Sequence, residues 1–156
     1  QETPMMLAAM RRPGMHKDKF LEWVFGDDIR MTGYINANMK NEVILTHDNR
    51  FLLYDPSIRI INMDDAEVQK TWEMISDEDR LKAFRDIGVR YYLRIGMEEK
   101  HQILQRAGLS DWESKGYLLR RYQAGDNVLF KFAYKSIMSP DEQTFPDEDE
   151  VIINVK

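Results

Sequence analysis

The chain contains no cysteine. This absence excludes disulfide bonds, thiolate nucleophiles and zinc sites built on cysteine, although it does not fix the compartment. The sequence also has no G-x-G-x-x-G and no G-K-[ST] motif, so a dinucleotide or phosphate-loop site of the usual kind is not expected. No apolar run approaches the roughly 20 residues that span a bilayer, so no membrane span is expected within these residues.

Net charge is nearly absent outside the C-terminus. The chain carries -5 overall, and residues 141–156 alone hold six acids and one lysine. Residues 1–140 are therefore neutral and lack the polybasic stretch that is typical of nucleic-acid binding. We expect no nucleic-acid partner, and we interpret residues 136–156 as an acidic tail that solvates a terminus.

Metal-ligating patterns are scarce as well. The three histidines, at positions 16, 47 and 101, are far apart and none belongs to an H-x-x-x-H pair. The acidic run at 147–150 lacks the spaced ligands and the turning glycine of a calcium loop. No metal site and no cofactor are therefore predicted.

Helical and strand patterns alternate along the 156 residues, 43% of which are apolar. Alternation of this kind predicts one α/β domain with right-handed crossovers. We expect a three-layer, mainly parallel sheet of about five strands, closed by a C-terminal antiparallel hairpin around the turn "QAGDN". The predicted strands cover 43–46, 58–63, 89–95, 117–122 and 128–134. The predicted organisation is an N-terminal helical segment (1–28), the α/β domain (29–135) and the acidic tail (136–156).

Several predicted helices separate these strands. Two are expected at 17–25 and 29–38, interrupted by Gly26-Asp27-Asp28, and a short helix or turn is expected at 49–54. A helix capped by Asp64-Asp65 should turn Val68, Trp72 and Ile75 inward. The next begins at Ser76, as its N-cap, and ends at Gly88. A last helix is expected at 97–107.

The N-terminal stretch contains a cluster of flexible apolar side chains. Met5, Met6, Leu7 and Met10 precede the breaker Arg11-Arg12-Pro13-Gly14. Methionine fills irregular gaps readily, so we interpret the cluster as a flexible packing patch rather than a soft-metal site. The chain also begins with Gln rather than Met, which is compatible with a processed or excised piece.

Polar side chains follow the first predicted strand, in the sequence "THDNR". Ligands of open α/β sheets bind beyond the carboxyl ends of the strands. The candidate ligand-binding residues are therefore those at the predicted strand ends: Thr46, His47, Asp48, Asn49, Arg50, Asp64 and Arg94. His47 could act as a base oriented by Asp48.

A structural interpretation of the same residues competes with this one, and we favour it. Neighbouring residues of a strand point to opposite faces, so adjacent His and Asp do not automatically form a dyad. Asp48 and Asn49 are also good caps for a following helix. No catalytic residue is assigned.

Three stretches together resemble a known family. They are "YINANMKNEVILTHDNRFLLYDPSIRIIN", "DRLKAFRDIGVRYYLRI" and "LLRRYQAGDNVLFKF". They are similar to the extracytoplasmic C-terminal domain of polytopic GT-C glycosyltransferases, the relatives of dolichyl-phosphate-mannose protein mannosyltransferases. The similarity extends over residues 29–132. The chain departs from the family in lacking a proline near Met39-Lys40.

The resemblance implies a soluble, non-catalytic accessory domain, tethered to the membrane on its periplasmic or external face. Its partner would be the membrane-embedded part of the same polypeptide, and the lipid-linked sugar or the acceptor could also contact it. The family's catalytic acid lies in a loop that is not part of this chain, so no catalytic residue is carried over. Two alternatives remain open: a free-standing flavodoxin-like domain that binds a small molecule, and a structural interaction domain.

Overall fold

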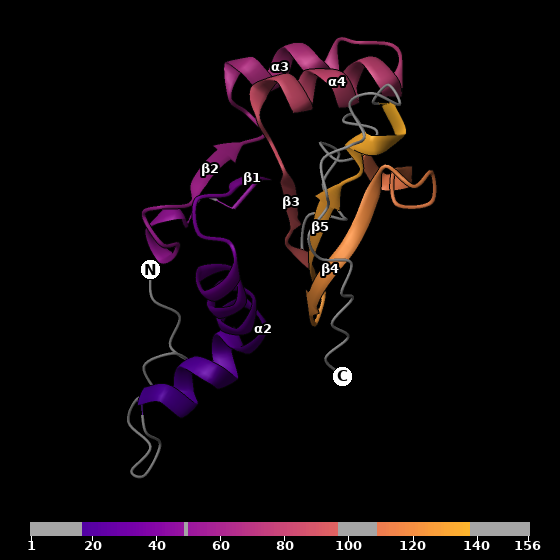
Figure 1. Ribbon diagram of the computed structural model, residues 1–156. Coiled ribbons are helices and arrows are strands. Elements are labelled where there is room, and N and C mark those ends of the chain that lie inside the picture. Colours follow the sequence, from indigo (N-terminus) through magenta and orange to yellow (C-terminus); the bar gives the residue numbers. More distant parts are fainter. Residues whose placement is uncertain (1–16, 49, 97–108, 138–156) are drawn as a thin grey trace.

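The computed structural model describes residues 17–48, 50–96 and 109–137, and these form one open five-stranded sheet of order β2-β1-β3-β5-β4 (Figure 1). β1 pairs in parallel with β2 and β3, whereas β5 pairs antiparallel with β3 and β4. The strands are β1 (Val43–Thr46), β2 (Arg59–Asn62), β3 (Tyr91–Arg94), β4 (Leu118–Ala124) and β5 (Asn127–Phe132).

The α/β class and the terminal antiparallel hairpin are confirmed, but a mainly parallel sheet is not. Two strand pairs are parallel and two are antiparallel, so the sheet is mixed. The reason lies in how the hairpin joins the sheet. It docks on β3 through β5, and both pairings of β5 are therefore antiparallel.

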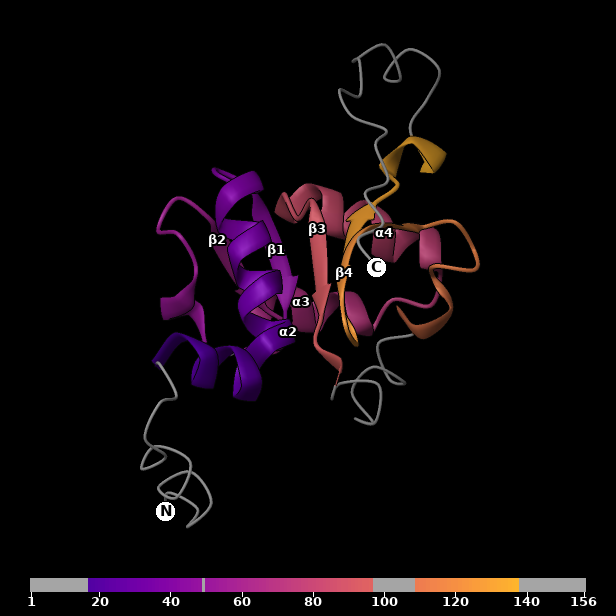
Figure 2. The same ribbon diagram turned by 90° about the horizontal axis from the view of Figure 1, so that it is seen from below.

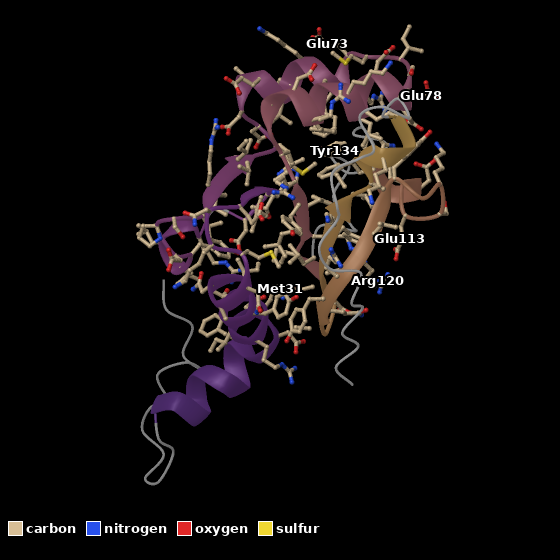
Figure 3. All side chains as sticks on the ribbon, viewed as in Figure 1. Met31, Glu73, Glu78, Glu113, Arg120 and Tyr134 are labelled. Atoms are coloured by element: carbon tan, nitrogen blue, oxygen red, sulfur yellow. The ribbon has the colours of Figure 1, made fainter. Side chains whose placement is uncertain are left out.

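Helices lie against both faces of the sheet (Figures 1 and 2). On one face, α2 (Lys17–Asn38) buries Met31 (labelled in Figure 3) and Ile35 with Ile44 of β1 and Leu129 of β5. On the other face, α3 (Ala66–Trp72) and α4 (Asp77–Ile87) pack against the opposite side chains of the same strands. Side-chain alternation explains this division, because successive residues of a strand face opposite layers.

The two predicted N-terminal helical segments meet at a kink inside α2. The non-helical residue is Phe25, with φ -125° and ψ 20°, so the break falls at Phe25 and not at Gly26-Asp27-Asp28. Asp27 then pairs with Arg30 one turn later, an i,i+3 contact that suits a continuing helix. α2 runs across the predicted boundary between residues 28 and 29, and the division into segments stays a prediction.

Both ends of α4 agree with the predicted capping. The Ser76 hydroxyl accepts a hydrogen bond from the Asp79 N–H at 3.2 Å, and Gly88 ends the helix with φ 89°. That left-handed conformation favours glycine. The expectation that Ile75 faces inward is wrong. α3 ends at Trp72, so Ile75 falls in the link to α4, where it is 99% exposed.

The cap of α3 differs from the prediction in detail. Asp65 occupies the N-cap position, but its carboxylate makes no capping bond to the helix. It accepts instead from the backbone N–H of Asn62, at 3.0 Å. The side chain therefore fixes the turn between β2 and α3.

The hairpin that closes the sheet turns at Gly125 and Asp126. Gly125 has φ 57°, and a Cβ there would lie 1.9 Å from the Asp27 carboxylate on α2. The left-handed conformation of the turn therefore favours glycine, and the Asp27 carboxylate would have to move to make room for a side chain. Three 3-10 helices complete the described chain: η1 (Phe51–Leu53), η3 (Leu109–Asp111) and η4 (Tyr134–Ile137).

The predicted helix at 97–107 lies outside the described residues. Among the helices of the described part, none combines the length and the apolar composition that crossing a bilayer requires.

Candidate functional site

The end of β1 is tied to its neighbour by Thr46. This side chain is fully buried, and its Oγ1 donates to the Leu93 carbonyl oxygen of β3 at 3.0 Å. The same oxygen accepts from the Asp48 N–H at 3.0 Å. Thr46 therefore holds the chain in place where β1 ends and the polar stretch begins.

The Asp48 carboxylate is fully engaged within the protein. Its Oδ1 accepts from the Arg50 backbone N–H at 3.0 Å and from Arg50 Nε at 2.8 Å. Its Oδ2 accepts from Arg50 Nη2 at 2.9 Å and from the Tyr54 hydroxyl at 2.7 Å. A bidentate arginine–carboxylate pair of this kind combines strength with strict geometry. Because Asp48 is only 7% exposed, little of the carboxylate is left for a ligand.

Arg50 extends the contacts from the β1 end to α2 and β5. Its Nη1 donates to Asp28 Oδ2 at 2.6 Å, and Asp28 Oδ1 accepts from Asn127 Nδ2 at 2.7 Å. Asn127 Oδ1 in turn accepts from the Gly96 N–H at 2.9 Å. We call the five side chains Asp28, Asp48, Arg50, Tyr54 and Asn127 the polar network.

The contacts of the polar network favour the charged forms of Asp48 and Arg50 and the neutral form of Tyr54. Burial raises the pKa of Asp48, but hydrogen bonds from Arg50 and Tyr54 outweigh it, and the net pKa lies below the usual value. Burial, together with the bond to Asp48, raises the pKa of Tyr54. The bond to Asp48 also raises the pKa of Arg50. A carboxylate with a lowered pKa is a weak base, so Asp48 is poorly suited to abstract a proton at neutral pH.

The structure brings together three of the predicted site residues: Thr46, Asp48 and Arg50. Asp48 also bonds to the backbone directly ahead of η1, which is close to the role expected of a cap. His47 is half-buried after the end of β1, and its role as a base oriented by Asp48 stays a prediction. Asn49 lies outside the described residues.

The other two predicted residues lie away from the polar network. Asp64 is exposed, and its backbone N–H bonds to Asn62 Oδ1 at 2.9 Å. Arg94 belongs to the opposite face of the sheet, where its guanidinium lies 5.4 Å from the Phe130 ring centroid. Arg120 approaches the same ring at 5.7 Å and pairs with Glu113 at 2.9 Å (Figure 3). Alternation along β3 separates Arg94 from the α2 side.

Sequence reasoning missed Asp28, Tyr54 and Asn127 as partners in the network. Asp28 was expected in the interruption between two helices, Tyr54 at the end of a short helix and Asn127 in a turn. One signal was accessible for Asn127: it opens the last strand, which has to lie beside the end of another strand if the hairpin joins the sheet. Asp28 and Tyr54 carry no comparable signal, because their contacts depend on the packing of α2 and η1.

Within the described ranges 17–48, 50–96 and 109–137, no group of three acidic or histidine side chains is placed to hold a metal ion.

Comparisons of the chain with protein families, with curated proteins and with solved structures give no match. The geometry of the polar network is therefore the principal guide to function. The polar network connects α2 and the residues next to η1 with the chain at the ends of β1 and β3 and at the start of β5. It can serve as a rigid structural clasp.

Proposed function

We propose that the chain is a non-catalytic accessory domain of a membrane glycosyltransferase that uses a polyprenyl-phosphate sugar donor. The domain is three-layered and lies on the periplasmic or external face of the membrane. Its partner is the membrane-embedded part of the same polypeptide. There it covers the active site or presents the acceptor. The family resemblance in 29–132 motivates the proposal.

The observation that supports a non-catalytic role is the hydrogen bonding of the Asp48 carboxylate within the protein. Its two oxygens accept four hydrogen bonds from Arg50 and Tyr54, and its pKa is held below the usual value. The buried carboxylate at the carboxyl end of β1, where a ligand was expected, is thus used to hold the fold. A site built in this way supports positioning better than it supports proton transfer.

The first test is incubation of the isolated chain with lipid-linked sugar donors and acceptors. We expect no sugar transfer by the chain alone, measured as radiolabelled or mass-shifted acceptor. Sugar transfer by this chain alone would contradict the proposal that it is a non-catalytic domain.

A second test addresses the membrane enzyme directly. The proposal expects a series of long apolar segments in the reading frame that encodes the residues upstream of Gln1. In that full-length protein, Asp48→Asn should lower transfer by loosening the domain, whereas Asp64→Asn, at an exposed carboxylate, should leave transfer unchanged. A frame that opens at a start codon with no such segments would contradict the proposal.

A second candidate function, small-molecule binding by a free-standing flavodoxin-like domain, draws on one observation. The polar residues Thr46, Asp48 and Arg50 do gather at the carboxyl end of β1, the edge where such sheets bind ligands. This candidate predicts a ligand-induced rise in melting temperature that His47→Ala and Asp48→Ala abolish. If neither substitution changes binding, the ligand does not use this edge.

A further inference from the structure

Exposed apolar side chains gather where α2 meets η1. Six large hydrophobic residues are exposed in the described ranges, and four of them belong to these two elements: Phe25 (37%), Ile29 (44%), Leu52 (95%) and Leu53 (50%). We call these four residues the α2–η1 patch. Single exposed apolar residues are ordinary on protein surfaces, whereas a local cluster is a candidate contact surface.

Hydrogen bonds show that η1 lies alongside α2 between Asp28 and Asn36. Arg50, just ahead of η1, bonds to Asp28, the residue before Ile29. The Leu53 carbonyl oxygen accepts from Asn36 Nδ2 at 2.9 Å. Asn36 lies seven residues beyond Ile29 and hence on the same face of α2. η1 therefore runs alongside the face of α2 that carries Ile29.

We propose that the N-terminal apolar cluster of this same chain, Met5, Met6, Leu7 and Met10, folds back and covers the α2–η1 patch. The inference is independent of the glycosyltransferase proposal. Residues 1–16 lie outside the described part of the structure, and they connect directly to the start of α2 at Lys17.

The length of the connecting chain fits. α2 begins at Lys17, and at about 1.5 Å per residue Phe25 and Ile29 lie about 12 and 18 Å along the helix. Residues 11–16 provide six residues, which span up to about 20 Å when extended. The Pro13-Gly14 pair between the cluster and α2 favours a change of direction over a longer helix. Met10 therefore lies within reach of both patch residues on α2.

The chemistry of the segment also fits the surface. A patch formed between an α-helix and a 3-10 helix is irregular, and unbranched methionine side chains adapt to irregular apolar surfaces. The basic pair Arg11-Arg12 follows the cluster in sequence, and α2 offers Asp27, which pairs with Arg30 and has a side chain that is 46% exposed. Because the segment is tethered, its effective concentration at the patch is in the millimolar range, above that of an ordinary intermolecular partner.

The decisive experiment is methyl NMR on the whole chain, Gln1–Lys156, with ¹³C-labelled methionine ε-methyl and leucine δ-methyl groups. We expect nuclear Overhauser contacts from the methyl groups of Met5, Met6 or Met10 to those of Leu52 or Leu53. Leu52→Ser should weaken these contacts. Ile75→Ser is the matched control, because Ile75 is 99% exposed on the link between α3 and α4, and the contacts should persist in it.

Limited trypsin digestion gives an independent readout at the Arg11–Arg12 bond. Loss of one leucine contact should speed cleavage roughly three- to tenfold in Leu52→Ser and leave Ile75→Ser at the wild-type rate. Both variants change exposed residues, so both should fold.

Three outcomes would overturn the inference. Sharp methionine signals without contacts to Leu52 or Leu53 would show that the segment does not cover the patch. Contacts that disappear on dilution, with a dimer in light scattering, would assign the patch to a second copy. Patch signals that broaden only when phosphatidylcholine–phosphatidylglycerol vesicles are added would assign it to a lipid surface.

Discussion

The two faces of the sheet hold their helices in different ways. On the α3–α4 face, aromatic rings surround Phe84, with centroids at 5.3 Å (Phe132), 5.5 Å (Trp72) and 6.0 Å (Trp112). On the α2 face, the apolar packing ends at the carboxyl end of β1, where Arg50 bridges Asp48 and Asp28. Charged contacts occur on both faces, but the Asp77 and Lys115 side chains of the α3–α4 face are 23% and 45% exposed, whereas the Asp48 side chain is 4% exposed. The α3–α4 layer is therefore held chiefly by burial, and the α2 layer adds a more deeply buried charged clasp.

The difference matters because the two kinds of contact fail differently. Burial is non-directional and roughly proportional to the area removed from water, so its loss scales with the atoms removed. A partly buried ion pair depends on each partner, since removing one leaves the other without compensation. The aromatic layer should therefore supply more stability, and the polar network should supply more specificity.

The largest expected effect is on the aromatic layer. Phe84 is fully buried, so Phe84→Ala should lower the free energy of unfolding by about 3–5 kcal/mol through lost burial and a residual cavity. Urea denaturation followed by tryptophan fluorescence measures the change. Ile75→Ala, at a 99% exposed residue, is the control and should stay within about 0.5 kcal/mol. A loss below about 1 kcal/mol for Phe84→Ala would show that α4 is not held by this layer.

The polar network should give the next largest effect. Asp48→Asn keeps the shape of the side chain but removes its charge, so that of the two carboxylates that bond to Arg50 in the described part of the chain, Asp28 alone keeps its charge. We expect a loss of about 2–3 kcal/mol, below the value for a fully buried pair because the Arg50 side chain is 39% exposed. The same denaturation experiment measures it, with Asp64→Asn as an exposed control. If Asp48→Asn and Asp64→Asn lost the same free energy of unfolding, the polar network would not add stability to the α2 face.

Acid should weaken the clasp, and it should also weaken the contacts of Asp77, whose pKa the Lys115 bond lowers. The folded-state pKa of Asp48 lies below its unfolded value, so its contribution is present above about pH 4 and is lost as the pH falls through the folded pKa. Unfolding free energy measured between pH 6 and pH 2.5 should therefore decrease. The decrease should be smaller in Asp48→Asn and unchanged in Ile75→Ala. An identical pH dependence in wild type and Asp48→Asn would contradict the assignment.

The smallest expected effect concerns a single hydroxyl. Tyr54→Phe removes the 2.7 Å bond to Asp48 and should cost about 1 kcal/mol. The double variant with Asp48→Asn tests the coupling, because the two residues share one contact. We expect a combined loss smaller than the sum of the single losses. Full additivity would mean that Tyr54 acts independently of the network.

The predictable parts of the molecule are those that depend on neighbouring residues. The turn at "QAGDN", the N-cap Ser76 and the terminator Gly88 were all readable, because each has its cause within a few residues. Ile75 was misplaced because its position depends on where α3 ends, and helix ends are weakly encoded. The hairpin was expected, but its docking through β5, which makes the sheet mixed, was not.

The candidate site was also predictable only where it depends on neighbouring residues. Polar residues after β1 were expected from the local sequence, and so was the use of Asp48 to satisfy backbone at the following turn. The partners Asp28 and Asn127 come from residues far from Asp48 along the chain. No local pattern indicates such a contact, because it arises only when α2 and β5 meet the same edge of the sheet.

The sequence by itself determined the α/β class, the order of the elements and the polar cluster at 46–50, since periodicity, capping and turn chemistry act over short distances. Only the tertiary structure decided that β5 pairs with β3 and that Arg50 joins Asp48 to Asp28. It also decided which apolar residues of α2 and η1 remain exposed. These outcomes depend on which surfaces meet when the layers pack, and burial is non-directional, so the local sequence pattern does not indicate which residues will meet.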